Sequence, residues 1–190
     1  MERLKDLSIE TLFERAGSTA PAPGGGAVTA LCGMLGVSLI LKALRISLRH
    51  APDTAALLAA EPVLEGLAQA LGQAADADSA AYGAYIAAVR APRTTDQETT
   101  LRRKQLEAAA VAATEVAIDA IEHVDRASAE ARAIGALILP RMAADLKAGL
   151  HLLAAARANA EDNGRENLEA AGAEEHARLA QRFEAAKLAG

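Results

Sequence analysis

The chain has 190 residues, a formal net charge of −5 and a pI of about 5.4. That length suits a single domain over residues 1–190, and the acidic balance argues against a nucleic-acid partner, which would normally bind a basic face. About a quarter of the residues are alanine and only 2% are aromatic, a composition that favours closely packed helices. We therefore expect an all-α fold, a bundle of long antiparallel helices with essentially no sheet.

The single cysteine, Cys32, rules out an intramolecular disulfide and suggests a buried, reduced thiol. The chain does not begin with the pattern of a secretory signal. Its most apolar run, residues 27–41, is short for a membrane span and rich in small residues. These features predict a cytoplasmic protein without a membrane partner.

A short amphipathic helix is expected near the N-terminus, with Ser8 as its N-cap and Gly17 as its stop. A second helix is predicted over about residues 26–49. Its first half is apolar all round, and Gly33 and Gly36 would let a neighbouring helix approach closely. Its second half carries cations at helical spacing, which either stabilise the helix C-terminus or form a stripe that attracts an acidic ligand: Lys42, Arg45 and Arg49.

Pro52 breaks this helix, and Asp53 or Thr54 can cap the next. That next helix extends to about residue 90, and Pro62 either kinks it or begins a restarted segment. Further helices are predicted over about residues 96–126 and 128–160, the second bent at Pro140. Asn163-Gly164 indicates a turn, followed by a last amphipathic helix in the polar tail.

The segment between the first two helices combines two prolines with three glycines at residues 24–26. Pro21 and Pro23 hold the chain extended, whereas the glycines let a ligand or another backbone approach. The N–H groups that follow stand at the positive end of a helix dipole. This loop is either a site for an anion or carbonyl group, or a flexible junction into the bundle.

Acid–base groups are concentrated in residues 75–82. Asp76 and Asp78 interrupt an alanine-rich helix, and Tyr82 follows Asp78 by one turn on the same face. Either carboxylate could act as a general base with a pKa raised by apolar surroundings, or could be solvated or paired with a cation. Asp119 and His123 share the same spacing and suit either proton transfer or a surface pair.

A di-iron bundle is excluded because none of the four histidines follows a glutamate by three residues. The sequence also contains no His-Glu-x-x-His, Walker or Gly-x-Ser-x-Gly motif. Catalysis would therefore depend on acid–base groups and polarising donors.

Residues 19–28 resemble the Ser-x-x-Pro-x-Pro-Gly-Gly-Gly-Ser-Val signature of the formiminotetrahydrofolate cyclodeaminase and methenyltetrahydrofolate cyclohydrolase family. Three further segments are similar to family motifs. They are Leu4-x-x-Leu-Ser-Ile at the start, the Asp-x-Asp-x-x-Ala-Tyr run of residues 76–82, and Ala-Thr-Glu-Val at residues 113–116.

The resemblance implies an all-helical homodimer that handles one-carbon units on reduced folate, with a tetrahydrofolate derivative as substrate and neither a metal nor a further cofactor. Both family reactions pass through a tetrahedral carbon between two folate nitrogens. The resemblance implies Asp78 as the carboxylate that transfers a proton or anchors the pterin. It also implies a substrate-binding surface made by Pro23, Gly24, Gly25, Gly26, Asp76 and Tyr82, with Lys42, Arg45 and Arg49 attracting the glutamate tail.

Two segments depart from the family pattern. Residues 47–50 read Ser-Leu-Arg-His where the family has Gly-Lys-Lys, and residues 133–136 read Ala-Ile-Gly-Ala where a Ser-Asp pair is expected. Because no fused formiminotransferase domain accompanies the chain, we expect methenyltetrahydrofolate cyclohydrolase activity. The alternatives are formiminotetrahydrofolate cyclodeaminase activity with release of ammonia, or a non-catalytic folate-binding or structural helical protein.

Overall fold

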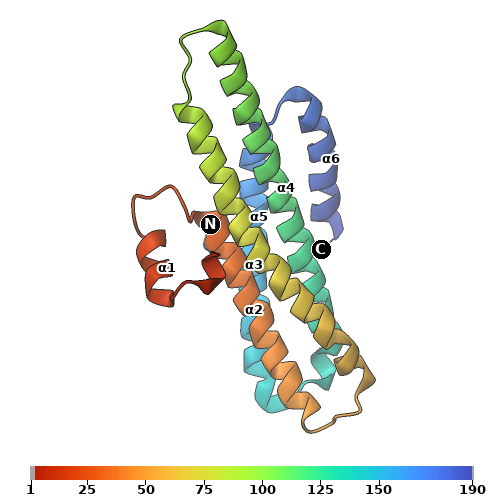
Figure 1. Cartoon of the computed structure of the whole chain (residues 1–190). Helices are drawn as coiled ribbons and strands as arrows, with labels where there is room; N and C mark the ends of the chain where they lie inside the picture. The colour runs from red at the N-terminus through yellow and green to blue at the C-terminus, as the bar shows by residue number, and fades with distance from the viewer. Residues whose placement is uncertain (1–2, 190) are drawn as a thin grey trace.

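Every regular element in residues 3–189, the part of the chain that this computed structural model describes, is helical (Figure 1). The all-α prediction is therefore confirmed. The described part of the chain contains six α-helices and three short 3-10 helices, of which η1 precedes α1 and η2 and η3 join α4 to α5. The elements are η1 (Leu4–Asp6), α1 (Ile9–Ala16), α2 (Gly25–Leu48), α3 (Ala55–Arg90), α4 (Asp96–Ile134), η2 (Gly135–Leu137), η3 (Pro140–Met142), α5 (Ala143–Glu169) and α6 (Ala173–Ala189).

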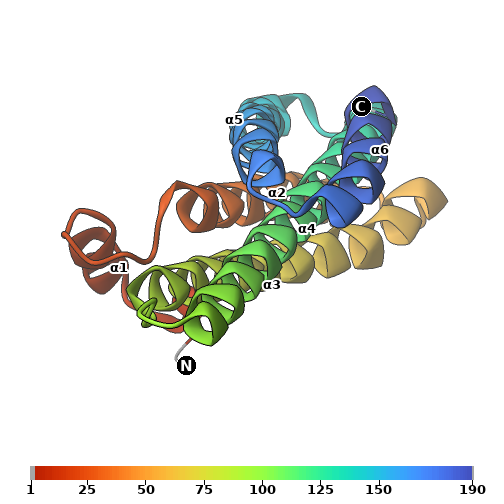
Figure 2. The same cartoon turned by 90° about the horizontal axis from the view of Figure 1, so that it is seen from above.

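The four long helices α2, α3, α4 and α5 run antiparallel along the chain and form the bundle (Figure 1). Helix α1 stands beside the start of α2, whereas α6 lies on the other side of the molecule, as both views show (Figure 2). Helices α3 and α4 continue past the N-terminal end of α2 as a projecting hairpin (Figure 1). That projection leaves one end of the bundle open for a cleft.

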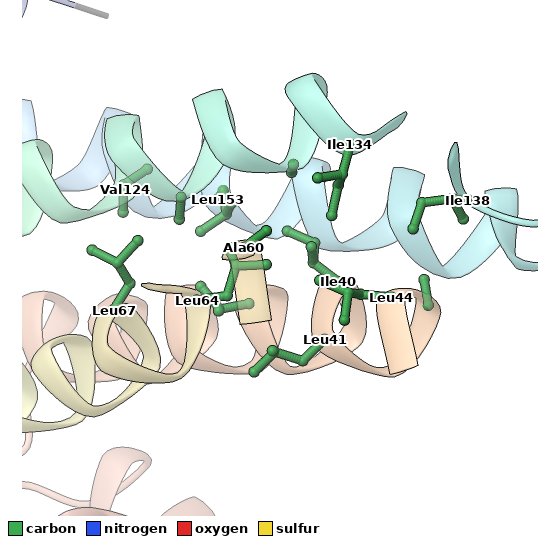
Figure 3. Packing of buried hydrophobic residues seen from close by; sticks show 14 of the residues in the cluster. Ile40, Leu41, Leu44, Ala60, Leu64, Leu67, Val124, Ile134, Ile138 and Leu153 are labelled. Atoms are coloured by element: carbon green, nitrogen blue, oxygen red, sulfur yellow. The ribbon is translucent and has the colours of Figure 1, made fainter. Parts of the chain in front are cut away.

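The main core lies toward the opposite end, where aliphatic side chains from the four long helices meet (Figure 3). Removing these side chains from water supplies the main stabilising force, and the many alanines let the helix axes approach. The largest side chains that are fully buried there include Ile40, Leu44, Leu64, Val124 and Leu153.

Helix α2 crosses α5 with backbone against backbone. A Cβ atom added at Gly36 would lie 2.8 Å from the carbonyl oxygen of Gly149, and one added at Gly149 would lie 2.6 Å from the carbonyl oxygen of Gly36. At Gly33 the same atom would lie 3.3 Å from Cβ of Ala156. The close approach predicted at Gly33 and Gly36 is therefore confirmed.

Helix α2 is long and apolar enough to cross a membrane, by length and composition alone. However, 56% of its most apolar window is buried inside the bundle. A central core helix meets the same criteria, because it is also apolar on most of its surface.

Local signals placed several helix ends correctly. Ser8 caps α1 by accepting a hydrogen bond from the Thr11 N–H group at 3.1 Å, and Gly17 is its C-cap.

Helix α3 continues through the exposed Pro62 without a restart, because Leu57 and Leu64 are buried on either side of it and hold both halves in the core.

Two predicted boundaries are wrong. Helix α4 continues to Ile134 rather than ending near residue 126, since Ala127 and Ala131 are fully buried in the core. Pro140 begins a 3-10 turn instead of bending a helix, a position where the missing N–H group costs nothing.

The predicted turn at Asn163-Gly164 is also wrong, because both residues lie inside α5. Phe183 of α6 packs so closely on Gly164 that an added Cβ atom would lie 2.5 Å from its ring. The glycine therefore serves helix packing, which local sequence does not reveal.

We expect Gly36→Ala to lower the free energy of unfolding by about 1–3 kcal/mol, because the new methyl group would collide with the Gly149 backbone. Gly66→Ala is the matched control: a Cβ atom there has no neighbour within 4 Å, so the change should stabilise the protein by about 0.5–1 kcal/mol. Urea denaturation of both variants measures this. Equal stability of the two would contradict the tight crossing.

Candidate functional site

A cleft of about 360 Å³ opens at the N-terminal end of α2, lined also by residues of α3, α4 and the end of α5. Its walls combine glycine backbone and alanine methyl groups with a few polar and aromatic side chains. The lining residues are Pro21, Gly24, Gly25, Gly26, Asp78, Ala81, Tyr82, Tyr85, Ala109, Ala110, Ala113, Asn163, Glu166, Asn167 and Ala170. Five sequence-predicted residues, Gly24, Gly25, Gly26, Asp78 and Tyr82, are thus brought together.

The carboxylate of Asp78 caps the start of α2. Gly24 occupies the N-cap position and has no side chain, and the Ala27 N–H group donates a hydrogen bond to Asp78 instead. A Cβ atom at Gly26 would overlap the Asp78 carboxylate and lie 2.7 Å from Nδ2 of Asn163. Only glycine at position 26 therefore allows Asp78 and Asn163 to sit against the helix backbone.

Burial raises the pKa of Asp78 above its ordinary value, and the hydrogen bond from Ala27 opposes this only in part. Carboxylates usually gain from a helix N-terminus, so the net rise indicates that desolvation is the larger effect at this position. A carboxylate whose pKa has moved toward neutrality is suited to take up and return a proton.

Three polar side chains form a hydrogen-bonded group behind Asp78. The Thr29 hydroxyl donates to Oδ1 of Asn159 at 2.5 Å, and Nδ2 of Asn163 donates to the same oxygen at 3.2 Å. Asn159 and Asn163 are one turn apart on α5, and Thr29 lies one turn into α2. The group joins the start of α2 to α5 beside the cleft.

Two aromatic rings form one wall of the cleft. Tyr82 and Tyr85 of α3 stack with centroids 6.2 Å apart and ring planes inclined by 19°. Their side chains remain partly exposed, which leaves a flat apolar surface next to Asp78. Such a surface suits a planar heterocycle.

Among the polar and aromatic lining residues, sequence reasoning missed four: Tyr85, Asn163, Glu166 and Asn167. A signal for two of them was present, because Asn159, Asn163 and Asn167 recur every fourth residue and mark one face of an alanine-rich helix. The turn expected at residues 163–164 hid this periodicity.

Other predicted site residues lie elsewhere. The Asp76 carboxylate accepts a hydrogen bond from the Leu4 N–H group at 2.7 Å and so fixes the N-terminal arm to α3. Pro23, which follows a cis peptide bond, is buried beside the loop and is not among the residues that line the cleft.

Lys42 and Arg45 of α2, and Arg49 at its C-cap, are remote from the cleft. With a rise of 1.5 Å per residue, Lys42 stands about 24 Å along α2 from Gly26, and Arg45 and Arg49 stand farther. Lys42 pairs with Asp145 at 3.2 Å, and Arg45 pairs with Glu61 at 2.6 Å. The structure therefore does not bring this stripe to the cleft.

The segments that depart from the family pattern also lie at the far end. Residues 47–50 end α2, and residues 133–136 join α4 to η2 beside Ile138 and Leu44 (Figure 3). These departures remove no residue from the cleft walls.

In the second predicted acid–base pair, Asp119 and His123, the aspartate has another partner. Asp119 accepts a hydrogen bond at 2.6 Å from Arg182 of α6, so its carboxylate is held in an ion pair across two helices. Among the side chains that the structure describes, no group of three or more His, Cys, Asp or Glu residues could hold a metal ion.

The raised pKa of Asp78 has a consequence for stability. The folded state binds the Asp78 proton more tightly than the unfolded chain does, so the ionised carboxylate costs stability above its folded pKa. Asp78→Asn should therefore give equal or higher unfolding free energy than wild type at pH 7. This advantage should vanish as the pH falls below about 3.9, the ordinary pKa of an aspartate in an unfolded chain.

Asp125→Asn is the control with the opposite sign. Asp125 accepts a hydrogen bond at 2.7 Å from Arg157, and losing this charged bond should cost about 1–3 kcal/mol at pH 7. Urea denaturation at pH 7 and pH 3.5 measures both variants. A large loss of stability in Asp78→Asn at pH 7 would contradict the dominance of desolvation.

Comparison with known proteins gives a consistent picture. The family model for formiminotransferase-cyclodeaminase matches residues 8–184. A methenyltetrahydrofolate cyclohydrolase from Methylorubrum extorquens is 32% identical over 113 residues, which cover 57% of this chain and 54% of that protein. The match thus spans about half the length of this curated relative.

A crystal structure of formiminotetrahydrofolate cyclodeaminase from Thermotoga maritima superposes with a TM-score of 0.82 at 17% identity, covering 98% of this chain and 91% of that one. At this identity the likeness shows the fold. The family match extends from α1 to α6, and the chain belongs to the formiminotransferase-cyclodeaminase family.

Proposed function

We propose that this protein acts in folate one-carbon metabolism and hydrolyses the methenyl bridge of methenyltetrahydrofolate to give 10-formyltetrahydrofolate. The observation that carries the proposal is Asp78, whose carboxylate has a raised pKa and faces a cleft beside two stacked tyrosines. The name of the Methylorubrum relative and the family match support it.

The charge of the cleft suits the reacting group. Its charged lining residues are Asp78 and Glu166, both acidic. The methenyl bridge is a delocalised cation between two nitrogens, whereas the formyl group of the product is neutral. Acidic side chains and aromatic faces both attract a delocalised cation, so the cleft favours the substrate over the product.

In the proposed reaction water adds to the bridge carbon, and Asp78 accepts one proton as the C–O bond forms. The bond from this carbon to N5 then breaks, N5 takes the proton held by Asp78, and the hydroxyl proton leaves to solvent. One proton is released overall as a cation becomes a neutral formyl group. Asp78 therefore acts first as a general base and then as a general acid.

Cyclodeaminase activity is the second candidate, because the family name includes that reaction. There a folate nitrogen would attack the formimino carbon and a protonated amino group would leave as ammonia, again with one group that accepts and returns a proton. One sample assayed for loss of methenyl absorbance and for ammonia release distinguishes the two. Binding of folate without either product would instead indicate the non-catalytic alternative.

We also propose that the protein is a cytoplasmic homodimer that needs no metal or further cofactor. Exposed apolar side chains near the tip of the α3–α4 projection, Val89 and Leu101, support association there. Light scattering tests the dimer, and activity that persists after dialysis against EDTA tests independence from metal.

Asp78→Asn should lower kcat for methenyl hydrolysis by about 10²–10⁴-fold, because the amide cannot accept the proton. Asn still accepts a hydrogen bond from Ala27, so affinity for the neutral product 10-formyltetrahydrofolate should change little. Steady-state kinetics and calorimetric titration measure the two effects. Asp119→Asn is the control, and activity of Asp78→Asn within threefold of wild type would exclude Asp78 as the catalytic base.

Gly26→Ala should also abolish most activity, because its methyl group would displace Asp78 and Asn163 from the start of α2. Gly83→Ala is the matched control on α3, since a Cβ atom there has no neighbour within 4 Å and Gly83 does not line the cleft. Comparable kinetics for the two variants would contradict the role given to Gly26.

A further inference from the structure

A small, partly open hollow, called the cavity below, lies on the bundle side of Asp78. Its volume is about 20 Å³, room for about one water molecule. Helices α2, α3, α4 and α5 all contribute to its wall. Most of the wall is alanine, leucine and valine, but four side chains are polar: Thr29, Asp78, Asn159 and Asn163.

The cavity and the cleft share a wall. Gly26, Asp78 and Asn163 line both spaces, so Asp78 stands at the boundary between the cavity and the cleft. Because Gly26 has no side chain, the Asp78 carboxylate and the Asn163 amide can both lie against the space that its Cβ atom would fill.

The polar side chains around the cavity have hydrogen-bonding capacity left for a ligand. Thr29 and Asn163 both donate to Oδ1 of Asn159. These two bonds use neither the Nδ2 hydrogens of Asn159 nor Oδ1 of Asn163. A buried water normally makes two to four hydrogen bonds to such groups.

We propose that this cavity is a binding site for one water molecule, held by Asp78, Asn159 and Asn163, and that this water exchanges protons with Asp78 from the bundle side. The water site itself is independent of the reaction. Its part in proton transfer rests on the proposed hydrolysis.

The proposal predicts how the Asp78 carboxylate titrates. A water that donates a hydrogen bond to the carboxylate favours its charged form, so its removal should raise the pKa further. The other titratable groups on the shared walls are Tyr82 and Tyr85 of α3 and Glu166 of α5. The lining residues that α2 and α4 contribute are not titratable.

Ala120→Val tests the site by filling the cavity from α4, because Ala120 lines it. Ala112→Val is the matched control, because it adds the same side chain to the exposed face of α4. In crystals of the ligand-free protein, wild type and Ala112→Val should show a water within hydrogen-bond distance of Asp78, and Ala120→Val should not. Ala160→Val fills the cavity from α5 if Ala120→Val does not fold.

The carboxyl ¹³C signal of Asp78, followed by NMR in the same three proteins, gives a readout that needs no substrate. Its midpoint should rise by about one pH unit in Ala120→Val and stay unchanged in Ala112→Val. An empty cavity in wild type, or equal midpoints in all three, would overturn the water site even if the enzyme hydrolyses folate.

Kinetics test separately whether the water exchanges protons with Asp78 during the reaction. In Ala120→Val the pH at which kcat for methenyl hydrolysis rises should move upward with the Asp78 midpoint, while folate affinity stays within about threefold of wild type. An unchanged pH profile in an active Ala120→Val variant would remove the water from proton transfer. Absence of turnover in wild type would instead count against the proposed function, and the water site would still be decided by density and NMR.

Discussion

The position of Asp78 against the first turn of α2 is the contact on which the rest of the site depends. Helix α2 begins with glycines and has no side chain of its own to cap the N–H groups of that turn, so a carboxylate from α3 does so. That arrangement requires α2 and α3 to pack closely at this end, and it requires a glycine at position 26. The same contact fixes Asp78 at the boundary between the cleft and the bundle interior.

Stability and chemistry make opposite demands at this contact. The main core lies toward the other end, where aliphatic side chains from four helices exclude water. The cleft end instead buries polar groups among alanines, and its carboxylate is held in surroundings that disfavour its charge. A protein with a strong core can tolerate such an unfavourable group, because its cost is small beside the apolar area buried elsewhere.

Much of this arrangement could be predicted from composition and local motifs. Alanine content, the Ser8 cap and the proline and glycine run gave the helical class, the first helix and the start of α2. What local sequence could not supply were effects of packing. Asn163-Gly164 has the composition of a turn, yet Gly164 is needed because Phe183 packs on it. Lys42 and Arg45 have the spacing of a free basic stripe. In the structure, however, they form ion pairs with Asp145 and Glu61.

The contact between Gly164 and Phe183 also bears on how this chain can evolve. Asn163 lines the cleft, and its neighbour Gly164 packs against α6. One turn of α5 therefore contributes both to the cleft and to the packing of the last helix. A larger residue at position 164 would force Phe183 and then α6 away, and a smaller one at 183 would leave a void behind the asparagine. Substitutions at positions 164 and 183 must therefore compensate each other. As a result, α6 constrains how the cleft can evolve, although α6 does not line it.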